Sequence, residues 1–282
     1  MKVFNNVEEI QKWCIRLKEQ GKKIGIVPTM GFLHEGHLTL VREAKRLCDI
    51  VVVSIFVNPI QFGQGEDFGE YPRDLSQDTA LLQNELADAV FAPTVKEMYP
   101  NGYSTFLEVN SPITTKLCGN SRPGHFKGVT TVVSKLFNIC QPDLAFFGQK
   151  DYQQLLVVKK MVRELNFPIE IVGVPIVREY DGLAISSRNV NLTPDQRQAA
   201  LTISSSLKMA QEFIENGETN TRELKQKIQN LIKSEGQPEI EYIEIVDDQE
   251  LLDLEKIIGK VLIAVAVKYG NTRLIDNLLV EV

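Results

Sequence analysis

Two histidines stand three residues apart in the segment His34-Glu-Gly-His37, directly after a short apolar run. Gly31 and Gly36 allow a ligand to approach the backbone closely. If a helix begins at this segment, its N–H groups favour an anion such as a phosphate, and both imidazoles can face that anion. A metal pair and ordinary surface histidines are the alternatives. A zinc site lacks ligands here, because the H-E-x-x-H spacing is absent and the only other histidine is His125.

A second polar loop, Asn58-Pro-Ile-Gln61, follows a longer apolar run. The side chains of Asn58 and Gln61 offer neutral amide donors and acceptors at the end of an expected strand. Such groups suit the hydroxyls of a small substrate better than they suit acid or base catalysis. The alternative is that the Asn-Pro pair simply starts a turn.

A third loop combines a glycine, a lysine and an aspartate in the order Gly148-Gln-Lys-Asp151. Gly148 lets a base or ribose lie against the backbone, and Asp151 can accept hydrogen bonds from ribose hydroxyls. Lys150 supplies a compact positive charge for a phosphate. Asp151 as a plain helix N-cap is the alternative.

A fourth loop carries Ser186, Ser187 and Arg188 in succession. Two hydroxyls and one guanidinium make a phosphate clamp without a Walker lysine. The P-loop pattern is missing from the sequence, which argues against P-loop chemistry. The pattern G-x-S-x-G is missing too, so neither serine is predicted to be a hydrolase nucleophile.

Alternating helical and apolar segments position the first three loops. The run 50–57 is continuously apolar, as in a parallel strand that is covered on both faces. This alternation predicts an α/β protein with a doubly wound, Rossmann-like parallel sheet, in which ligands bind at the carboxyl ends of the strands. The expected strands are 23–27 (ending at Pro28), 50–57, 89–92, 144–147 and 169–174, and the expected helices are 7–21, 37–48, 75–86, 129–140 and 152–165.

The composition changes after about Val177, and a smaller C-terminal α+β domain is expected there. Thr193-Pro-Asp-Gln196 is typical of a helix start, with a threonine cap and a proline at the first helical position. The predicted domains are 1–177 and 178–282, which pack around a shared site. The smaller domain is expected to contain helices near 194–216 and 220–234 and strands near 239–246, 260–268 and 273–280.

Composition and charge exclude several classes of function. The 282 residues include 31 Lys and Arg against 37 Asp and Glu, a net charge of −6 that gives no general attraction for nucleic acid or anionic membranes. The apolar runs 50–57 and 261–267 are too short to span a bilayer, so a soluble cytoplasmic protein is expected. Four scattered cysteines predict reduced core or near-core thiols rather than disulfides.

Taken together, the loops resemble the pantothenate synthetase (pantoate–β-alanine ligase) family, a branch of the nucleotidylyltransferase superfamily related to class I aminoacyl-tRNA synthetases. The resemblance covers essentially the whole chain. It rests on six segments in the family's order and approximate spacing: Pro28-Thr-Met-Gly31, His34-Glu-Gly-His37, Asn58-Pro-Ile-Gln61, Arg122-Pro-Gly-His-Phe126, Gly148-Gln-Lys-Asp-Tyr-Gln-Gln154 and Ser186-Ser-Arg-Asn189.

The resemblance implies an ATP-dependent condensation of pantoate with β-alanine through a pantoyl-adenylate, with Mg²⁺ and in a homodimer. It implies no particular protein ligand for the metal. The triphosphate site it implies consists of His34, His37, Lys150, Ser186, Ser187 and Arg188. The implied remaining ATP contacts are Met30, Gly36, Gly148, Gln149, Asp151, Val177 and Ile185, and the implied pantoate contacts are Pro28, Thr29, Met30, Asn58, Gln61, Arg122 and Gln154.

Two of these positions and two other functions stay open. Gln149 stands where the family also uses glutamate, so a role as catalytic acid does not follow, and Arg122 could instead serve the Pro123-Gly124 turn. A mononucleotide adenylyltransferase would use the same histidines, but its phosphate acceptor would want more basic residues. A non-catalytic nucleotide or tRNA binder would want a basic domain, which an acidic chain of this size lacks.

Overall fold

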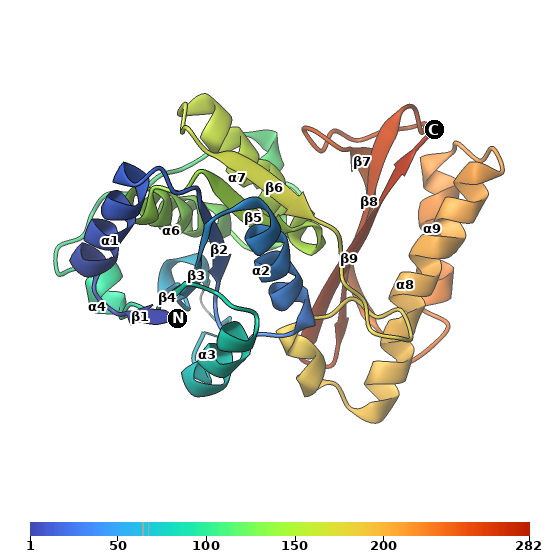
Figure 1. The fold of residues 1–282 in the computed structure, drawn as a ribbon. Coiled ribbons are helices and arrows are strands. Elements are labelled where there is room, and N and C mark those ends of the chain that lie inside the picture. Colours follow the sequence, from blue (N-terminus) through green and yellow to red (C-terminus); the bar gives the residue numbers. More distant parts are fainter. Residues whose placement is uncertain (64, 67) are drawn as a thin grey trace. The chain divides into compact units, whose positions relative to one another are not determined.

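The computed structural model describes residues 1–63, 65–66 and 68–282, which form two compact units (Figure 1). The first unit comprises residues 1–149 and 153–175, and the second comprises residues 150–152 and 176–282. The first unit is a parallel sheet with helices and the second is an antiparallel sheet with two long helices. The predicted fold class, α/β with a smaller α+β part at the C-terminus, is confirmed.

The sheet of the first unit has the strand order β1-β4-β3-β2-β5-β6, and every neighbouring pair is parallel. The chain runs outward from β2 through β3 to β4 and then returns to place β5 on the other side of β2. The order therefore reverses between β2 and β5, which is where doubly wound sheets bind their ligands. The strands are β1 (Lys2–Phe4), β2 (Ile24–Thr29), β3 (Ile50–Ile55), β4 (Ala89–Phe91), β5 (Leu144–Gly148) and β6 (Glu170–Val174).

Helices cover both faces of this sheet, as Figure 1 shows for α1, α6 and α2. Val51, Val52 and Val53 at the centre of β3 are fully buried, as their continuous apolar run predicts. The helices are α1 (Val7–Glu19), α2 (Glu35–Leu47), α3 (Leu75–Asn84), α4 (Val95–Met98), α5 (Cys118–Ser121), α6 (His125–Cys140) and α7 (Tyr152–Glu164), with short 3₁₀ turns η1 (Pro59–Gln61), η2 (Pro112–Thr114) and η3 (Gln149–Asp151).

Several predicted boundaries near the site are wrong. Helix α2 begins at Glu35 instead of residue 37, and strand β3 ends at Ile55 instead of residue 57. Strand β2 continues through Pro28 to Thr29, because Pro28 pairs with Ser54 in register and the Thr29 hydroxyl donates to the Ser54 carbonyl oxygen at 2.7 Å. Helix α6 begins at His125 instead of residue 129. Gly124, with φ of +81°, turns the chain into that helix in a backbone conformation that favours glycine.

The second unit is a three-stranded antiparallel sheet in the order β7-β8-β9, packed against α8 and α9. Thr193 and Gln196 form the predicted capping box at the start of α8. Ile203 and Leu207 of α8 pack in one core with Ile263 and Val265 of β8. The elements are η4 (Ser187–Asn191), α8 (Pro194–Glu215), α9 (Thr221–Ile232), β7 (Glu239–Asp247), β8 (Lys260–Tyr269) and β9 (Thr272–Glu281).

The cysteines lie where the sequence predicts. Cys14, Cys118 and Cys140 are buried and Cys48 is half-buried, and all four are thiols. Among the described residues, no helix is long and apolar enough to cross a membrane.

Candidate active site

A strained loop joins β2 to α2 and precedes the first histidine. Gly31 and Phe32 both have left-handed backbone angles, with φ of +82° and +51°. Asp78 of α3 holds this loop, because the Phe32 N–H donates to Oδ2 at 2.9 Å and the Leu33 N–H donates to Oδ1 at 2.7 Å. A Cβ on Gly31 would lie only 2.9 Å from Asp78 Oδ2. The carboxylate and the glycine therefore fix the path of the chain into α2.

Asp78 is only 2% exposed. Burial raises the pKa of its carboxyl group, while the backbone N–H groups of Leu33 and Phe32 act in the opposite direction. A buried carboxylate that accepts two backbone N–H groups is an anchor for the loop. Sequence reasoning missed it, because a single aspartate within an amphipathic helix carries no local sign of a partner 45 residues away.

His34 and His37 sit at the start of α2, with His34 as the N-cap residue. Their rings stack with centroids 4.0 Å apart and planes inclined by 32°. The His34 N–H donates to His37 Nδ1 at 3.4 Å, so a neutral His37 ring carries its proton on Nε2. A Cβ on Gly36 would lie 3.1 Å from the His34 ring, so the glycine makes room for that ring. The helix start thus combines backbone and imidazole N–H donors.

A cluster of buried amides follows β3. Asn58 is 1% exposed and Gln61 is 8% exposed. The Asn58 amide nitrogen donates to Gln61 Oε1 at 3.0 Å and to the Gly128 carbonyl oxygen at 3.1 Å. The Tyr99 hydroxyl donates to Asn58 Oδ1 at 2.9 Å, which uses the third hydrogen-bonding position of this amide. Asn58 therefore orients Gln61.

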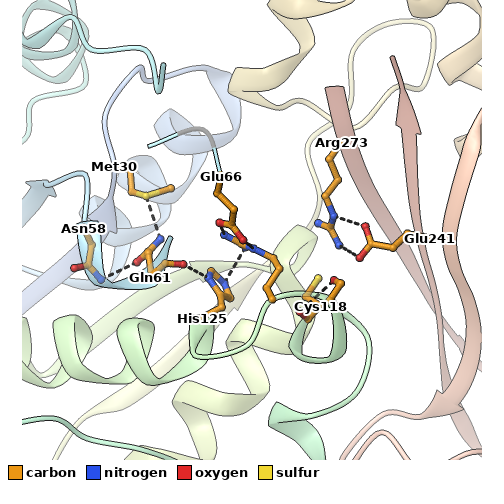
Figure 2. Close-up of polar contacts among 10 residues, drawn as sticks. Met30, Asn58, Gln61, Glu66, Cys118, His125, Glu241 and Arg273 are labelled. Carbon is orange, nitrogen blue, oxygen red and sulfur yellow. Dashed lines mark hydrogen bonds and ion pairs between the residues drawn. The ribbon is translucent and has the colours of Figure 1, made fainter. Parts of the chain in front are cut away.

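Gln61 lies between Asn58 and Met30, as Figure 2 shows. Its Nε2 donates to Met30 Sδ at 3.1 Å, and a thioether sulfur is a weak acceptor that a better ligand acceptor can replace. Gly128 of α6 lets the turn pack closely, because a Cβ there would lie 2.5 Å from the Ile60 carbonyl oxygen. The residues thus present a neutral amide donor in a fixed orientation at the carboxyl end of the sheet.

Arg122 and His125 form the next layer beside this cluster. His125 Nδ1 lies 2.8 Å from the Gln61 carbonyl oxygen, and His125 Nε2 lies 3.2 Å from Arg122 Nη1 (Figure 2). Arg122 makes two bonds to Glu66, at 2.8 and 2.6 Å. Burial would raise the pKa of Glu66, but Arg122, together with smaller effects of the Gly63 backbone and His125, more than offsets this and the pKa is lowered. Arg122 is therefore an ion-pair partner as well as a predicted pantoate contact.

Three glutamines follow β5, and they lie in two kinds of environment. Gln153 is buried, donates to the carbonyl oxygens of Ile113 and Lys116 at 2.8 and 2.7 Å and accepts from the Cys118 N–H at 3.1 Å. Gln154 and Gln149 are half-buried. The space where a Cβ of Gly148 would point is open within 4 Å, as close approach by a ligand requires.

In the second unit, residues 150–152 form a turn that carries Lys150 and the exposed Asp151. Asn277 Nδ2 donates to the Lys150 carbonyl oxygen at 2.9 Å, which fixes the backbone of the turn. The Tyr152 hydroxyl donates to the Asp248 carbonyl oxygen at 3.3 Å. The lysine side chain therefore extends from an anchored backbone.

A short hairpin in the second unit presents the predicted clamp. The Ile185 N–H donates to the Val177 carbonyl oxygen at 3.0 Å, so these two predicted ATP contacts lie side by side. Ser186 caps η4 by accepting from the Arg188 N–H at 3.3 Å. Ser186, Ser187 and Arg188 are all half-buried, so their side chains lie at the surface.

The hairpin is fastened at its base. Arg178 makes a two-pronged ion pair with Asp276 at 2.6 and 3.0 Å, and the Asp276 side chain is 3% exposed. Asn189 Nδ2 donates to Glu179 Oε1 at 3.0 Å and to the Ala184 carbonyl oxygen at 3.1 Å. These contacts hold the turn that carries the two serines.

The predicted site residues thus fall into two sets, one in each unit. The first unit brings Met30, Asn58 and Gln61 together and stacks His34 on His37. The second unit brings Val177 to Ile185 and Ser186 to Arg188. Across the described ranges, no three or more His, Cys, Asp or Glu residues gather in a way that could hold a metal ion.

The reversal of strand order between β2 and β5, with polar loops after both strands, is typical of α/β proteins that bind nucleotides or related ligands at this edge. The model of the pantoate–β-alanine ligase family matches residues 2–279. The pantothenate synthetase of Syntrophomonas wolfei is 62% identical over 282 residues, covering all of both chains. That of Heliobacterium modesticaldum is 55% identical with the same coverage. The chain belongs to the pantoate–β-alanine ligase family and is an enzyme of that class.

Solved structures agree with this assignment. The pantothenate synthetase of Thermus thermophilus matches with a TM-score of 0.94 and 46% identity, covering 99% of each chain. The pantoate–β-alanine ligase of Francisella tularensis, solved in complex with β-γ ATP and β-alanine, matches with a TM-score of 0.82 and 36% identity. That match covers 99% of this chain and 97% of the Francisella chain. The resemblance read from the six sequence segments is confirmed.

Proposed function

We propose that this chain condenses pantoate with β-alanine using ATP, through a pantoyl-adenylate, and releases pyrophosphate and then AMP. The observation that carries this proposal is the buried amide pair Asn58 and Gln61, which holds a neutral donor beside Met30 at the carboxyl end of the sheet. A small hydroxy acid needs such neutral donors for its hydroxyl. A phosphorylated acceptor would need cations there instead.

The triphosphate is proposed to bind at the start of α2. His37 Nε2–H and the backbone N–H groups of this helix start can donate to phosphate oxygens. Lys150, Ser186, Ser187 and Arg188 are proposed to complete the clamp. Charge grows on the departing pyrophosphate when the pantoate carboxylate attacks the α-phosphate, so donors placed beforehand lower the barrier. Mg²⁺ is proposed to travel with the nucleotide on its phosphate oxygens, and no protein ligand is assigned to it.

Adenosine is proposed to lie beside Gly148, where the open space next to the backbone suits a base or a ribose. Asp151 is exposed and can accept from ribose hydroxyls. The hairpin pair Val177 and Ile185 supplies two apolar side chains for the base. The remaining proposed ATP contacts are Met30, Gly36 and Gln149.

Pantoate is proposed to bind Gln61 and Gln154 through its hydroxyl and carboxylate, with Pro28, Thr29 and Met30 along one side. Asn58 contributes by holding Gln61, since its own amide positions are already bonded. Arg122 stands one layer away, bonded to Glu66 and His125, and these contacts involve three of the five N–H groups of its guanidinium. Gln154 is favoured over Gln153 because Gln153 holds three backbone groups.

The second half-reaction joins the unprotonated β-alanine amine to the activated carbonyl and expels AMP. The mixed anhydride hydrolyses readily, so water must be excluded while it waits. We propose that residues 178–282 act as a lid over the Rossmann-like domain 1–177. We also propose that the enzyme is cytoplasmic and works as a homodimer.

Exchange of labelled pyrophosphate into ATP tests the proposal, because it reports adenylate formation without the second substrate. With Mg²⁺ present, exchange is expected to require pantoate and to proceed without β-alanine. The Gln61→Ala variant is expected to lose exchange at low pantoate concentration, while the control Gln77→Ala, on α3, keeps it. Exchange that depends on a nucleotide monophosphate instead of pantoate would identify a mononucleotide adenylyltransferase and refute the proposal.

A further inference from the structure

One carboxylate of the second unit is shared between the turn Ser186–Arg188 and the long helix α8. Glu179 Oε1 accepts from Asn189 Nδ2 at 3.0 Å, and Glu179 Oε2 accepts from Arg197 Nη2 at 2.7 Å. Asn189 directly follows the turn, and Arg197 lies near the start of α8. Glu179 therefore gives one oxygen to each side and links the turn to the helix.

The amide of Asn189 has a defined orientation. Its Nδ2 donates to the Ala184 carbonyl oxygen at 3.1 Å as well as to Glu179, so both of its N–H groups are used. The opposite orientation would place Oδ1 against two acceptors, which excludes a flipped amide. Oδ1 is buried and accepts from no group among the described residues. Because a buried acceptor without a donor lowers the free energy of unfolding, the gain in stability from this side chain is small.

The turn Ser186–Arg188 is tied to the hairpin at both of its ends. Before the turn, the Ile185 N–H donates to the Val177 carbonyl oxygen at 3.0 Å. After the turn, the Asn189 N–H donates to the Ser186 carbonyl oxygen at 3.0 Å, and the Asn189 side chain bonds back to the hairpin. The donors of the turn therefore keep a fixed position only while both ties hold.

Arg197 connects the hairpin to α8. Its Nη2 donates to Glu179 Oε2 and to Asp181 Oδ2, both at 2.7 Å. The side chains of Arg197, Glu179 and Asp181 are 24%, 31% and 19% exposed, so water screens these ion pairs less than it would on an open surface. Since α8 packs in the core of the second unit, Arg197 gives the hairpin a rigid reference.

We propose that Glu179 and Asn189 are positioning residues that hold the turn Ser186–Arg188 in the geometry that the triphosphate requires. This inference rests on the proposed function, in which the turn binds the phosphates of ATP. Preplaced donors stabilise a developing charge only at hydrogen-bonding distance, so a small displacement of the turn lowers the rate. The two residues act through the turn and need no contact with ATP.

A reciprocal exchange of carboxylate and amide tests the link. Glu179→Gln directs a new N–H group at a donor of either Asn189 or Arg197, so one of the two bonds is lost. Asn189→Asp makes two carboxylates face each other. The double variant Glu179→Gln with Asn189→Asp again places an N–H donor opposite an oxygen, with the polarity reversed, and leaves an amide oxygen for Arg197. Only the bond to the Ala184 carbonyl oxygen stays lost.

The readout is exchange of labelled pyrophosphate into ATP with pantoate and Mg²⁺. Each single variant is expected to lower kcat at least about tenfold. KM for pantoate, which is proposed to bind in the first unit, should change less than about twofold. The double variant should be at least about fivefold faster than the product of the two single effects predicts. Glu212→Gln makes the same chemical change at an exposed position of α8 and should have no effect.

Urea unfolding separates this role from a purely structural one, because rates can be compared under conditions in which every variant is fully folded. Single variants with a lower unfolding midpoint but the kcat of wild type would overturn the proposal. A double variant no faster than the product of the single effects would do the same.

Substitutions of Arg197 supply a second test that leaves residues 179 and 189 in place. Arg197→Lys keeps a cation between the two carboxylates and should keep kcat within about threefold of wild type. Arg197→Met removes the cation and should lower kcat at least about tenfold. A fully folded Arg197→Met variant with the kcat of wild type would contradict the link to α8.

Arg188→Ala distinguishes a failure of this inference from a failure of the proposed function. A slow Arg188→Ala variant beside a Glu179→Gln variant of wild-type rate would overturn only the positioning role. An Arg188→Ala variant of wild-type rate would leave no clamp to position. A wild type without pantoate-dependent exchange would refute the proposed function and this inference with it.

Discussion

The amide cluster of the first unit and the serine–arginine turn of the second unit differ in how they are held. Asn58 and Gln61 are 1% and 8% exposed and bond to groups on other elements of the fold, including Gly128 of α6. The turn Ser186–Arg188 is half-buried and is capped by a bond within itself. The amides of the first region are therefore fixed by the surrounding fold, whereas the proposed clamp of the second region is more accessible.

This difference separates stability from activity. Removing a buried amide leaves several polar groups without partners inside the protein, which destabilises the fold. Lys150 and Arg188 are half-buried, so removing either is expected to disturb the fold less but to remove proposed stabilisation of a charge that grows during the reaction. Substitutions in the two regions should therefore produce different combinations of stability and rate.

The largest effects are expected at the cations of the clamp. Lys150→Ala and Arg188→Ala should each lower kcat by about 10²–10³-fold, since each removes a preplaced donor for the transition state. KM for pantoate should change much less. The free energy of unfolding should change by less than about 1 kcal/mol, because both side chains are only half-buried.

Steady-state kinetics with chemical denaturation checks this prediction. Lys159→Ala removes an exposed lysine of α7 and serves as the matched control. Equal losses in kcat and in pantoate affinity for Lys150→Ala would show that the lysine binds the ground state and not the developing charge.

In the amide cluster we expect a smaller effect, and one on stability and pantoate binding instead of on kcat. Asn58→Ala leaves the Tyr99 hydroxyl, the Gly128 carbonyl oxygen and Gln61 Oε1 without their partner, and should lower the free energy of unfolding by about 1–3 kcal/mol. KM for pantoate should rise because Gln61 is no longer oriented. Urea unfolding measures the first effect, with Asn138→Ala on the exposed side of α6 as control. Unchanged stability would mean that the cluster is not preformed.

Asp78, which anchors the loop before His34, is expected to have an effect on kcat that is smaller than that of the clamp cations. Asp78→Asn replaces one of the two acceptors for the Phe32 and Leu33 N–H groups with an N–H donor, so the loop should shift. We expect kcat to fall about tenfold, which corresponds to a rise of roughly 1.4 kcal/mol in the activation free energy. Asp74→Asn changes the same group at the N-cap of α3, where asparagine serves equally well, and should be neutral. If the two variants behave alike, Asp78 does not position the histidines.

The smallest effect concerns the ion pair of Glu66 with Arg122. The pKa of Glu66 is lowered in the folded state, so the ion pair stabilises the protein at pH values above the ordinary glutamate pKa, near 4.3. This stabilisation is lost as the pH falls below that value. Glu66→Gln should cost about 0.5–1 kcal/mol at pH 7, and this cost should shrink as the pH falls below the ordinary glutamate pKa near 4.3. A constant difference in the free energy of unfolding across that range would contradict the ion-pair assignment.

The sequence predicts the loops well where the signal is local. Asn58 and Gln61 follow a continuous apolar run, and Thr193 with Gln196 forms a capping box, so both features were located correctly. The parallel sheet is also predicted correctly, because helical segments and short apolar runs alternate regularly along the chain.

The rest depends on contacts between distant residues. Asp78 finds its role only when α3 meets the loop after β2, and Tyr99 only when it reaches Asn58. In the first turns of α6, Gly128 packs against the Ile60 carbonyl oxygen, a contact that no window of sequence reveals. Strand β1 has only three residues, too few for an alternating pattern to be recognised.

The structure of the enzyme with a non-hydrolysable ATP analogue and pantoate tests the central claim most directly. That claim is that one triphosphate is held by the histidines of the first unit and the clamp of the second. We expect phosphate oxygens within hydrogen-bonding distance of His37, Lys150 and Arg188 together, with Gln61 donating to pantoate. A nucleotide bound at the start of α2 while Lys150 and Arg188 remain out of reach of its phosphates would contradict the account.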